Sequence, residues 1–521
     1  MNLINRPELP EIIPETAPFD AAQRAWLSGF LAGFLSVEEA ADVPDAEEDD
    51  GAPWHDQTLG IEERMKLAEG RPLGRRLMAA MAQQDCGQCG YQCETYADAL
   101  ASGQEKQLNL CVPGGKSTAR MVKALYRELG GESGNVPAGP AVAGRPGTSR
   151  DRPLMASFVR AARLTGEGSA RLTNHIEFAF EPGTLDYAVG DSLGVRATND
   201  PALADTIVAA LGAAPDAEVG DGNGHSRALR DALVEDVSLS PAPDELFEML
   251  AGVATDGAER TKLLAMAAGK DPDGDLESLD VLAALEKFPH LTPSPKALIE
   301  SLENLQPRLY SISSSPKVDP ARVTLTVDAV RYETGGRLRK GLASNFLAER
   351  VAEGAAVPVY IQKAHGFAPP GNGATPIIMV GPGTGVAPFR AFLQERLARK
   401  ASGRSWLFFG HQHEKTDFFY RDELDGFLAT GTLTRLTTAW SRDGDRKIYV
   451  QDRMREAGDE LFRWLEDGAH FYVCGDASRM AADVDRALRD IVANHGGVGA
   501  EAADAYVDRL IEAGRYQRDV Y

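Results

Sequence analysis

Four cysteines crowded into one short segment constrain this chain more than any other feature of its sequence. Cys86, Cys89 and Cys93 follow one another at spacings of two and three intervening residues, and Cys111 completes the set. The chain of 521 residues holds five cysteines in all, and the fifth, Cys474, stands far from the others. In a reducing compartment such a group is more typical of a metal site than of disulfides.

Four thiolates match the ligand number of a 4Fe–4S cluster or of a structural zinc ion. Zinc more often uses two Cys-x2-Cys pairs, whereas here three cysteines are crowded and the fourth is solitary. Gly87 and Gly90 would let backbone N–H groups turn toward the sulfurs. We therefore expect an iron–sulfur cluster, with zinc or free thiols as the alternatives. The nearby run GGKST at 114–118 lacks the earlier glycine and the preceding strand of a P-loop, which excludes a nucleotide triphosphatase.

The charge and length of the chain exclude other classes of protein. Asp and Glu total 77 against 55 Lys and Arg, a net charge of −22, which is a poor footprint for nucleic-acid binding. No run reaches the ~20 apolar residues that span a bilayer. The first residues lack the basic-then-apolar order of a secretory signal, so we expect a cytoplasmic protein with no nucleic acid and no membrane as partner.

Changes in composition along the chain predict five segments. An apolar helix with an acidic stretch, for assembly or partner docking, occupies 1–50; because of this helix a homo-oligomer is possible. The four-cysteine domain follows at 51–129, and a Gly/Pro/Ala-rich flexible linker at 130–153. The remaining segments are 154–372, with a helical insertion at about 201–305, and 373–521.

Two kinds of β pattern distinguish the last two segments. Alternating apolar and polar residues at 174–180 and 323–330 predict strands of an antiparallel β-barrel. After Gly373, apolar runs separated by helical patterns predict the buried strands of a parallel α/β sheet, at 376–380, 406–409, 447–450 and 470–474. The fold class is therefore multidomain α+β and α/β, with a small helical cysteine segment at the N-terminal side.

Three short motifs suit the binding of a dinucleotide. In the first motif, the planar guanidinium of Arg308 can bind a pyrophosphate. The ring of Tyr310 can stack on a flat ring, and the hydroxyl of Ser311 can hydrogen-bond to a ring nitrogen. The segment 341–344 opens a helix, whose N–H groups suit a phosphate. Glycines in 381–385, between a strand and a helix, allow a dinucleotide to approach the backbone.

Together, these motifs are recognisable. From about Pro153 to Tyr521 the sequence resembles the ferredoxin-NADP reductase module of the diflavin reductases, and most closely the flavoprotein (alpha) subunit of assimilatory NADPH-sulfite reductase. The resemblance is carried by RLYSISSSP at 308–316, GPGTGVAPFR at 381–390, YVCGD at 472–476 and RYQRDVY at 515–521. That family normally carries an FMN domain before the module. Here the four-cysteine segment stands in that position, so the resemblance implies that no FMN is bound and that a cluster replaces it.

The resemblance also implies roles for single residues. FAD would be held by Arg308, Tyr310, Ser311, Gly341, Ser344 and Tyr521. NADPH would be held by Gly383, Thr384, Ser441, Arg442, Lys447, Tyr449 and Asp476, where the two cations favour NADPH over NADH. The residues beside the reacting rings would be Ser311, Cys474, Asp519 and Tyr521, with Tyr521 shielding the flavin.

The expected activity is an NADPH-dependent FAD oxidoreductase. Hydride passes from nicotinamide to FAD, electrons then leave singly through the 4Fe–4S cluster, and a siroheme-containing sulfite reductase beta subunit receives them. The alternative acceptors are nitrate or nitrite reductase or a generic hemoprotein. A different reading makes the cysteine segment a zinc docking module, with FAD reducing the acceptor directly.

Overall fold

The computed structural model describes residues 52–57, 59–128, 145–220, 226–364, 366–477 and 479–521. The chain divides into two compact units, Met1–Pro53 and Trp54–Tyr521, and the second carries every element described below. The predicted helix and acidic stretch at 1–50 lie outside the described residues, as does the linker from 130 to 144. None of the helices in the described ranges has the length and apolar character needed to cross a membrane.

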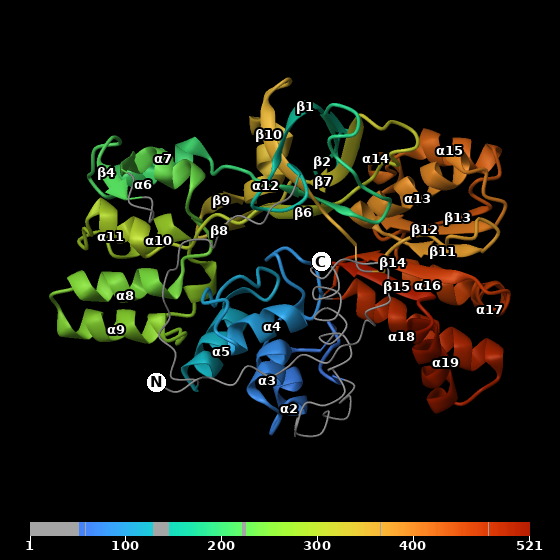
Figure 1. The fold of residues 1–521 in the computed structure, drawn as a ribbon, viewed down its shortest axis with the longest axis horizontal. Coiled ribbons are helices and arrows are strands. Elements are labelled where there is room, and N and C mark those ends of the chain that lie inside the picture. Colours follow the sequence, from blue (N-terminus) through green and yellow to red (C-terminus); the bar gives the residue numbers. More distant parts are fainter. Residues whose placement is uncertain (1–51, 58, 129–144, 221–225, 365, 478) are drawn as a thin grey trace, which may run out of the picture. The chain divides into compact units, whose positions relative to one another are not determined.

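The cysteine segment is helical apart from its ligand loops, as the sequence predicts. Its helices, drawn in blue in Figure 1, are α2 (Ile61–Leu67), α3 (Leu73–Ala80), α4 (Cys93–Ala101) and α5 (Gly115–Glu128). They enclose a small core in which Trp54, Leu100 and Val122 are fully buried. On α5 the buried positions recur at helical spacing, so one face packs inward and the opposite face is left for charged residues.

An antiparallel barrel forms the middle of the chain. Its strands are β1 (Leu154–Arg163), β2 (Thr173–Ala179), β3 (Ser192–Val195), β6 (Arg308–Ser311), β7 (Arg322–Asp328) and β10 (Ala356–Gln362), in the order β6-β3-β10-β1-β2-β7. The two edge strands meet, because Ile312 bridges to Leu325 and the Ser313 N–H donates to the Thr324 carbonyl at 2.7 Å. The sheet is therefore closed into a barrel, and its unpaired edges are largely removed.

Alternation along the strands fills the barrel. Val323, Leu325 and Val327 on β7 are buried and pack with Ile176 and Phe178 on β2. This agrees with the predicted period of two residues. After the barrel strands β6 and β7 come a hairpin, β8 (Arg331–Thr334) and β9 (Arg337–Lys340), the short helix α12 (Leu342–Asn345) and the π-turn η3 (Phe346–Arg350).

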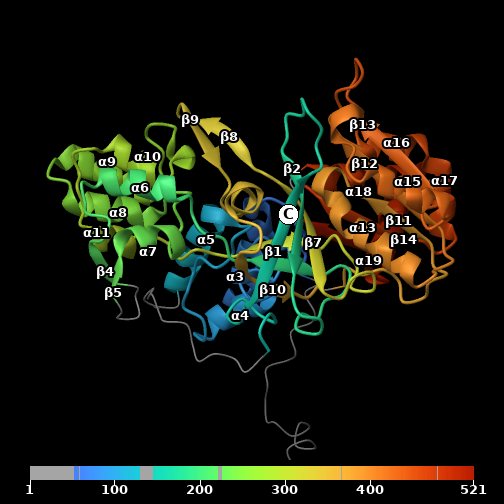
Figure 2. The same ribbon diagram turned by 90° about the horizontal axis from the view of Figure 1, so that it is seen from above.

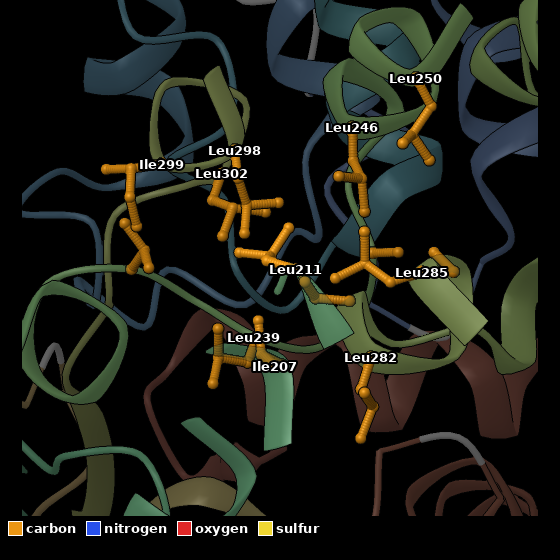
Figure 3. Packing of buried hydrophobic residues seen from close by; sticks show 14 of the residues in the cluster. Ile207, Leu211, Leu239, Leu246, Leu250, Leu282, Leu285, Leu298, Ile299 and Leu302 are labelled. Atoms are coloured by element: carbon orange, nitrogen blue, oxygen red, sulfur yellow. The ribbon is translucent and has the colours of Figure 1, made fainter. Parts of the chain in front are cut away.

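The insertion between β3 and β6 has a hydrophobic core of its own. Its elements are α6 (Pro201–Ala210), β4 (Glu218–Gly220), β5 (Ser226–Ala228), α7 (Leu229–Glu235), α8 (Asp244–Val253), α9 (Gly257–Ala267), η2 (Leu276–Ser278), α10 (Val281–Lys287) and α11 (Pro295–Glu300). Figure 2 shows the helices gathered into one bundle, and Figure 3 shows leucines such as Leu246, Leu282 and Leu298 converging between them. The predicted helical insertion is thus present, with a two-stranded ribbon added.

A parallel sheet forms the last domain. Its strands are β11 (Ile377–Val380), β12 (Ser405–His411), β13 (Arg435–Trp440), β14 (His470–Gly475) and β15 (Tyr516–Val520), in the order β13-β12-β11-β14-β15. Its helices are η4 (Gly383–Val386), α13 (Ala387–Ala398), α14 (Glu414–Asp417), α15 (Arg421–Ala429), α16 (Val450–Glu456), α17 (Gly458–Glu466), α18 (Met480–Gly496) and α19 (Ala500–Glu512). The strand order reverses at β11, where ligands of such sheets bind.

Both faces of this sheet are covered by helices. Alternate residues of β11 separate the two layers: Ile377 and Met379 pack with α13 and α15, whereas Ile378 and Val380 pack with α16 to α18. Figure 1 shows the two helical layers on either side of the strands. The continuous apolar runs of the sequence follow from burial on both faces.

Two predicted boundaries differ from the structure. The strand predicted at 447–450 is absent: these residues form a loop and the start of α16, and the strand is β13 instead. A short apolar run can form either a strand or a buried helix. Here Asp452 favours the helix, because its carboxylate accepts the Tyr449 N–H at 2.9 Å and so caps the start of α16. The predicted linker also ends early, because the Gly147 carbonyl accepts the Ile361 N–H of β10 at 2.8 Å.

Candidate functional site

All four clustered cysteines line one small cavity. Cys86 and Cys89 lie on the loop between α3 and α4, Cys93 begins α4, and Cys111 lies on the loop before α5. Leu110, Pro113 and Tyr96 complete the apolar wall. All four thiols are free of disulfides. The two loops therefore bring together the residues that the spacing singled out.

The backbone of the cysteine loop turns toward the sulfurs. Gly87 and Gly90 have φ of +67° and +93°, which favour glycine. The Cys89 thiol donates to the carbonyl of Tyr91, the residue after Gly90, at 3.5 Å. The backbone at Gln88 and Tyr91 also opposes the effect of burial on the pKa of Cys86 and Cys89. The expected N–H donors to the sulfurs, which would tune the potential of a bound cluster, stay a prediction.

Burial makes thiolates costly in this cavity unless a cation neutralises them. It raises the pKa of Cys86 and of Cys93 to about 12, and neighbouring cysteines add to the shift. The buried guanidinium of Arg64 opposes the rise in the pKa of Cys111, and Arg150 does the same for Cys89. Two arginines cannot balance four thiolates, so the donor set suits a group that brings its own positive charge.

The arrangement of the cysteines fits an iron–sulfur cluster. All four cysteines face one cavity, and a cluster offers a separate iron to each thiolate.

A second group of side chains joins the barrel to the last domain. Ser311 at the end of β6 donates its hydroxyl to Asp519 Oδ2 at 2.6 Å, and Cys474 Sγ lies 3.7 Å from the same oxygen. Asp519 is opposite Cys474 in the pairing of β15 with β14. The structure thus brings together three residues that are far apart in the sequence.

Burial disfavours the charged forms of Cys474 and Asp519 in this group. Burial raises the pKa of Cys474 well above its ordinary value, and the Asp519 carboxyl raises it further. Burial also raises the pKa of Asp519, although hydrogen bonds from Ser311 and Cys474 oppose the shift. Cys474 is fully buried and remains a thiol at neutral pH. A neutral thiol and a hydroxyl, fixed by one carboxyl, can orient a flat ring without reacting with it.

The chain terminus lies against the glycine-rich loop. Tyr521 Oη is 2.7 Å from Thr384 Oγ1, and the Tyr521 N–H donates to the Gly475 carbonyl at 3.1 Å. The loop itself lies on β14, since a Cβ on Gly385 would overlap the Cys474 carbonyl oxygen, and Gly383 has φ of +58°. Tyr521 remains 55% exposed, so its ring is free to cover or leave a neighbouring group.

The residues expected to hold FAD lie on two barrel elements. Arg308 and Tyr310 are half-buried on β6, and burial lowers the pKa of the Arg308 guanidinium. Gly341 and Ser344 lie at the start of α12, where a Cβ on Gly341 would come within 2.8 Å of the Ser344 hydroxyl. The Ser344 hydroxyl accepts the Val330 N–H at 3.2 Å. Glycine at 341 therefore permits the close turn.

The residues expected around the 2′-phosphate lie at the carboxyl ends of the strands. The Ser441 and Arg442 N–H groups donate to the carbonyls of His411 and Gln412, both at 2.9 Å, which fixes the loop after β13. Arg442, Lys447 and Tyr449 are exposed. Their side chains can therefore meet an incoming phosphate. Asp476 is placed differently, because its carboxylate accepts the N–H groups of Arg479 and Met480 at the start of α18.

Sequence reasoning missed Arg390, which connects the two large domains. From α13 its guanidinium donates to the Ser313 carbonyl at 2.6 Å and to Glu423 Oε2 at 2.7 Å, and it stacks over Tyr420. Arg390 ends the recognised motif at 381–390, so its position was visible in the sequence. Its partner on the barrel was not.

Three family models match the chain. They are described as "FAD binding domain" over residues 146–346, "Oxidoreductase NAD-binding domain" over 379–486 and "Putative Fe-S cluster" over 82–113. The third range contains all four clustered cysteines. The expected fold class, and the expectation of FAD, a nicotinamide dinucleotide and an iron–sulfur cluster, are confirmed by these matches.

Curated relatives match the larger part of the chain. The "Sulfite reductase [NADPH] flavoprotein alpha-component" of Photorhabdus laumondii is 42% identical over 72% of this chain and 61% of its own length. The protein of the same name from Bacillus subtilis is 40% identical over 77% of this chain and 66% of its own length. That of Escherichia coli O157:H7 is 43% identical over 72% and 61%. The chain therefore spans somewhat less than two thirds of these relatives.

Proposed function

We propose that this chain, which is similar over most of its length to the sulfite reductase flavoprotein alpha-components, oxidises NADPH and passes electrons through FAD and an iron–sulfur cluster to a hemoprotein. The observation that carries the proposal is the pair of sites in one chain. One is the Ser311–Asp519–Cys474 group between an FAD-type barrel and an NAD-type sheet. The other is a cavity lined by four cysteines.

When bound, FAD and NADPH supply two-electron hydride chemistry and the cluster supplies one-electron steps. The residues of the chain then hold the groups in register. Ser311 and Cys474, both hydrogen-bonded to Asp519, would support the reacting faces of the two rings. Thr384 and the glycine-rich loop would bind the pyrophosphate of NADPH. Tyr521 would lie where the nicotinamide must enter, so it would have to move before hydride transfer.

The choice of NADPH rests on the cations after β13. Arg442 and Lys447 are exposed at the carboxyl edge of the sheet, beside the fixed backbone of Ser441. An additional phosphate gives each cation a charge-assisted hydrogen bond that NADH cannot make. The names of the relatives also specify NADPH as the cofactor.

The proposed acceptor is the siroheme-containing beta subunit of sulfite reductase. The relatives are named as alpha-components of that enzyme, which supports a hemoprotein component as the partner. Copurification of the chain with a siroheme protein, and NADPH-dependent sulfite reduction by the pair, would test the identity of the acceptor. Reduction of nitrite reductase or another hemoprotein in its place would redirect the proposal.

The relay role of the cluster is tested with Cys86→Ser. Ferricyanide can take electrons directly from reduced flavin, so NADPH–ferricyanide activity should survive, whereas transfer to the hemoprotein should collapse. The matched lesion at the other site, Cys474→Ala, should slow both assays together because hydride transfer precedes both routes. Flavin content is measured alongside, since loss of a ligand can unfold the cysteine segment. Full hemoprotein-linked activity in Cys86→Ser would instead favour a docking role for this segment.

A further inference from the structure

The cysteine loop contacts the strand that carries the expected FAD residues. Gln88, between Cys86 and Cys89, is only 7% exposed, and its side-chain Nε2 donates to the Pro307 carbonyl at 2.7 Å. Pro307 immediately precedes Arg308 and strand β6. A buried amide of this kind is costly to leave unpaired, so the hydrogen bond selects one position of the loop on the barrel.

Two further contacts hold the same loop. Arg150, from the barrel side of the chain, donates to the Gln88 carbonyl at 3.3 Å and to Gln306 Oε1 at 2.8 Å. Gly87 lies against Gln362 of β10, where a Cβ would overlap the Gln362 amide. The contact is therefore close, and the residues that the cysteine loop contributes to it, Gly87 and Gln88, are uncharged. On the barrel it involves Pro307, just before β6, and Gln362 on β10.

A second, ionic patch lies on the outer face of α5. Arg120 forms two hydrogen bonds with Asp244 of α8, at 2.8 and 2.7 Å, and Lys123 pairs with Glu245. Asp244 is 14% exposed, so this pair is partly shielded from solvent. Near the same patch Asn109 donates to Glu303 at 3.0 Å. The cations occupy the face of α5 opposite its own core, where Val122 and Leu125 are buried.

We propose that these two patches hold the cysteine loop in a fixed electron-accepting position on the FAD module, with Gln88 and Arg150 as positioning residues. The inference rests on the proposed function and deepens it. A direct connection from the cysteine loop to β6 runs through Gln88, its hydrogen bond to Pro307, and one peptide link to Arg308. When bound, FAD would receive two electrons as hydride from each NADPH, and the cluster would accept them one at a time. The cluster would pass each electron to the hemoprotein acceptor before taking the next, and the protons of the reduced flavin would leave to water.

The flexible linker predicted at 130–153 would allow the cysteine segment to move as an independent domain. Instead, two separate patches connect the described residues of the segment to the barrel and to its insertion. A cluster held in this way needs no domain swing to meet the flavin.

The first test is Gln88→Ala in the full holoprotein. With FAD, iron and NADPH–ferricyanide activity unchanged, flavin-to-cluster transfer in a single turnover should slow by about tenfold or more, because small displacements of reacting groups are costly. Amide hydrogen exchange should also rise at 86–90 and 306–308. The matched control is Gln104→Ala, an exposed glutamine of the same segment. Wild-type transfer and exchange in a fully loaded Gln88→Ala would overturn the proposal.

The second test does not touch the cysteine loop. Reversing the pair on α8, Asp244→Lys with Glu245→Lys, should slow flavin-to-cluster transfer and raise exchange at 86–90. Adding Arg120→Glu and Lys123→Glu should restore both, since opposite charges would again meet. The control reversal is Lys106→Glu, exposed on the same segment. If the α8 reversal and the α5 reversal each slow the transfer but the two combined do not restore it, the ionic patch does not position the cluster.

These outcomes separate the inference from the proposed function. If NADPH does not reduce the cluster of the wild-type protein at all, the relay itself is wrong. If the wild-type cluster is reduced and Gln88→Ala shows wild-type transfer and exchange, the relay stands and the fixed docking is wrong. Slowed transfer together with raised exchange, in proteins with full flavin and iron, supports both.

Discussion

Three side chains from two domains share one buried carboxyl group at the proposed hydride-transfer site. Ser311 comes from the barrel, and Cys474 and Asp519 come from neighbouring strands of the parallel sheet. Removing the Asp519 oxygen would therefore release two hydrogen-bond donors at once. A substitution of Asp519 is therefore expected to change both the stability of the protein and the proposed hydride transfer. The pH dependence of the free energy of unfolding reports on stability alone.

Asp519→Asn should change the pH dependence of stability. Burial raises the pKa of Asp519 above its ordinary 3.8, so the folded state keeps the proton to higher pH than the unfolded state. The resulting stabilisation is complete below the unfolded pKa and is lost as pH rises through the folded pKa. The variant cannot lose a proton, so its free energy of unfolding relative to wild type should grow across this window and then level off.

Denaturant unfolding at a series of pH values above 4 measures that difference. A flat difference for Asp519→Asn would contradict the raised pKa.

At the other end of the nicotinamide nucleotide, charge should decide the cofactor. Arg442→Glu or Lys447→Glu should raise KM for NADPH far more than for NADH, because NADPH alone carries the additional phosphate. A charge-assisted hydrogen bond contributes about 1.5–3 kcal/mol, which corresponds to roughly 10- to 100-fold in KM. Steady-state kinetics with both cofactors measure the ratio. Equal losses with NADPH and NADH would mean that the phosphate binds elsewhere.

Among the elements, the glycine-rich loop after β11 packs closely on a neighbouring strand. Gly385 packs directly on the backbone of β14, so the loop and the strand that carries Cys474 move as one. The strand order reverses between β12 and β14 on the two sides of β11, which opens the crevice at this loop. The position of the loop follows from sheet topology, and its closeness to β14 requires glycine.

Gly385→Ala should displace this loop. The added methyl group would meet the Cys474 carbonyl, and forced overpacking costs about 1–3 kcal/mol. We expect a lower unfolding temperature and weaker NADPH binding. The matched control is Gly426→Ala in α15, where a Cβ meets open space and should stabilise by about 0.4–1 kcal/mol. Unchanged stability and NADPH affinity in Gly385→Ala would contradict the packing.

In the molecule as a whole, the barrel and the parallel sheet are joined by polar contacts on α13. The Ser315 N–H donates to Gln394 Oε1 at 3.0 Å, and the Ser315 hydroxyl donates to Glu395 at 2.6 Å. Arg390 adds its bonds to the Ser313 carbonyl and to Glu423. Ser313 and Ser315 lie just after Ser311 in the chain. The contact between the domains would therefore also position Ser311 at the proposed hydride-transfer site.

Arg390→Ala should loosen this connection. Breaking a buried pair costs about 3–5 kcal/mol, and partial exposure of Glu423 lowers the expectation to about 2–3 kcal/mol. Hydride transfer from NADPH to FAD should slow, whereas FAD content should be kept because β6 and α12 are untouched. Stopped-flow reduction of the flavin measures the rate, and Arg399→Ala, at the exposed end of α13, is the control. Hydride transfer at the wild-type rate in Arg390→Ala would show that the contact is not needed for alignment.

The sequence by itself determined the parts of this protein whose signals are local. Period-two alternation predicted β2 and β7, apolar runs predicted β11, β12 and β14, and cysteine spacing predicted a four-ligand site. The motifs at 308–316 and 381–390 identified the two dinucleotide modules, because glycine, arginine and aromatic residues serve these ligands through nearby backbone. The error at 447–450 arose because a short apolar run has no distinguishing period.

Only the tertiary structure decided which distant residues meet. In the sequence, Ser311 comes before all strands of the parallel sheet and Asp519 lies on the last of them. Gln88 and Pro307 are also far apart in the sequence. No spacing rule connects such pairs, because strand order and docking of domains depend on many weak contacts together. For the same reason the linker composition could not show that the cysteine loop would rest on the barrel, since a flexible tether permits docking without specifying it.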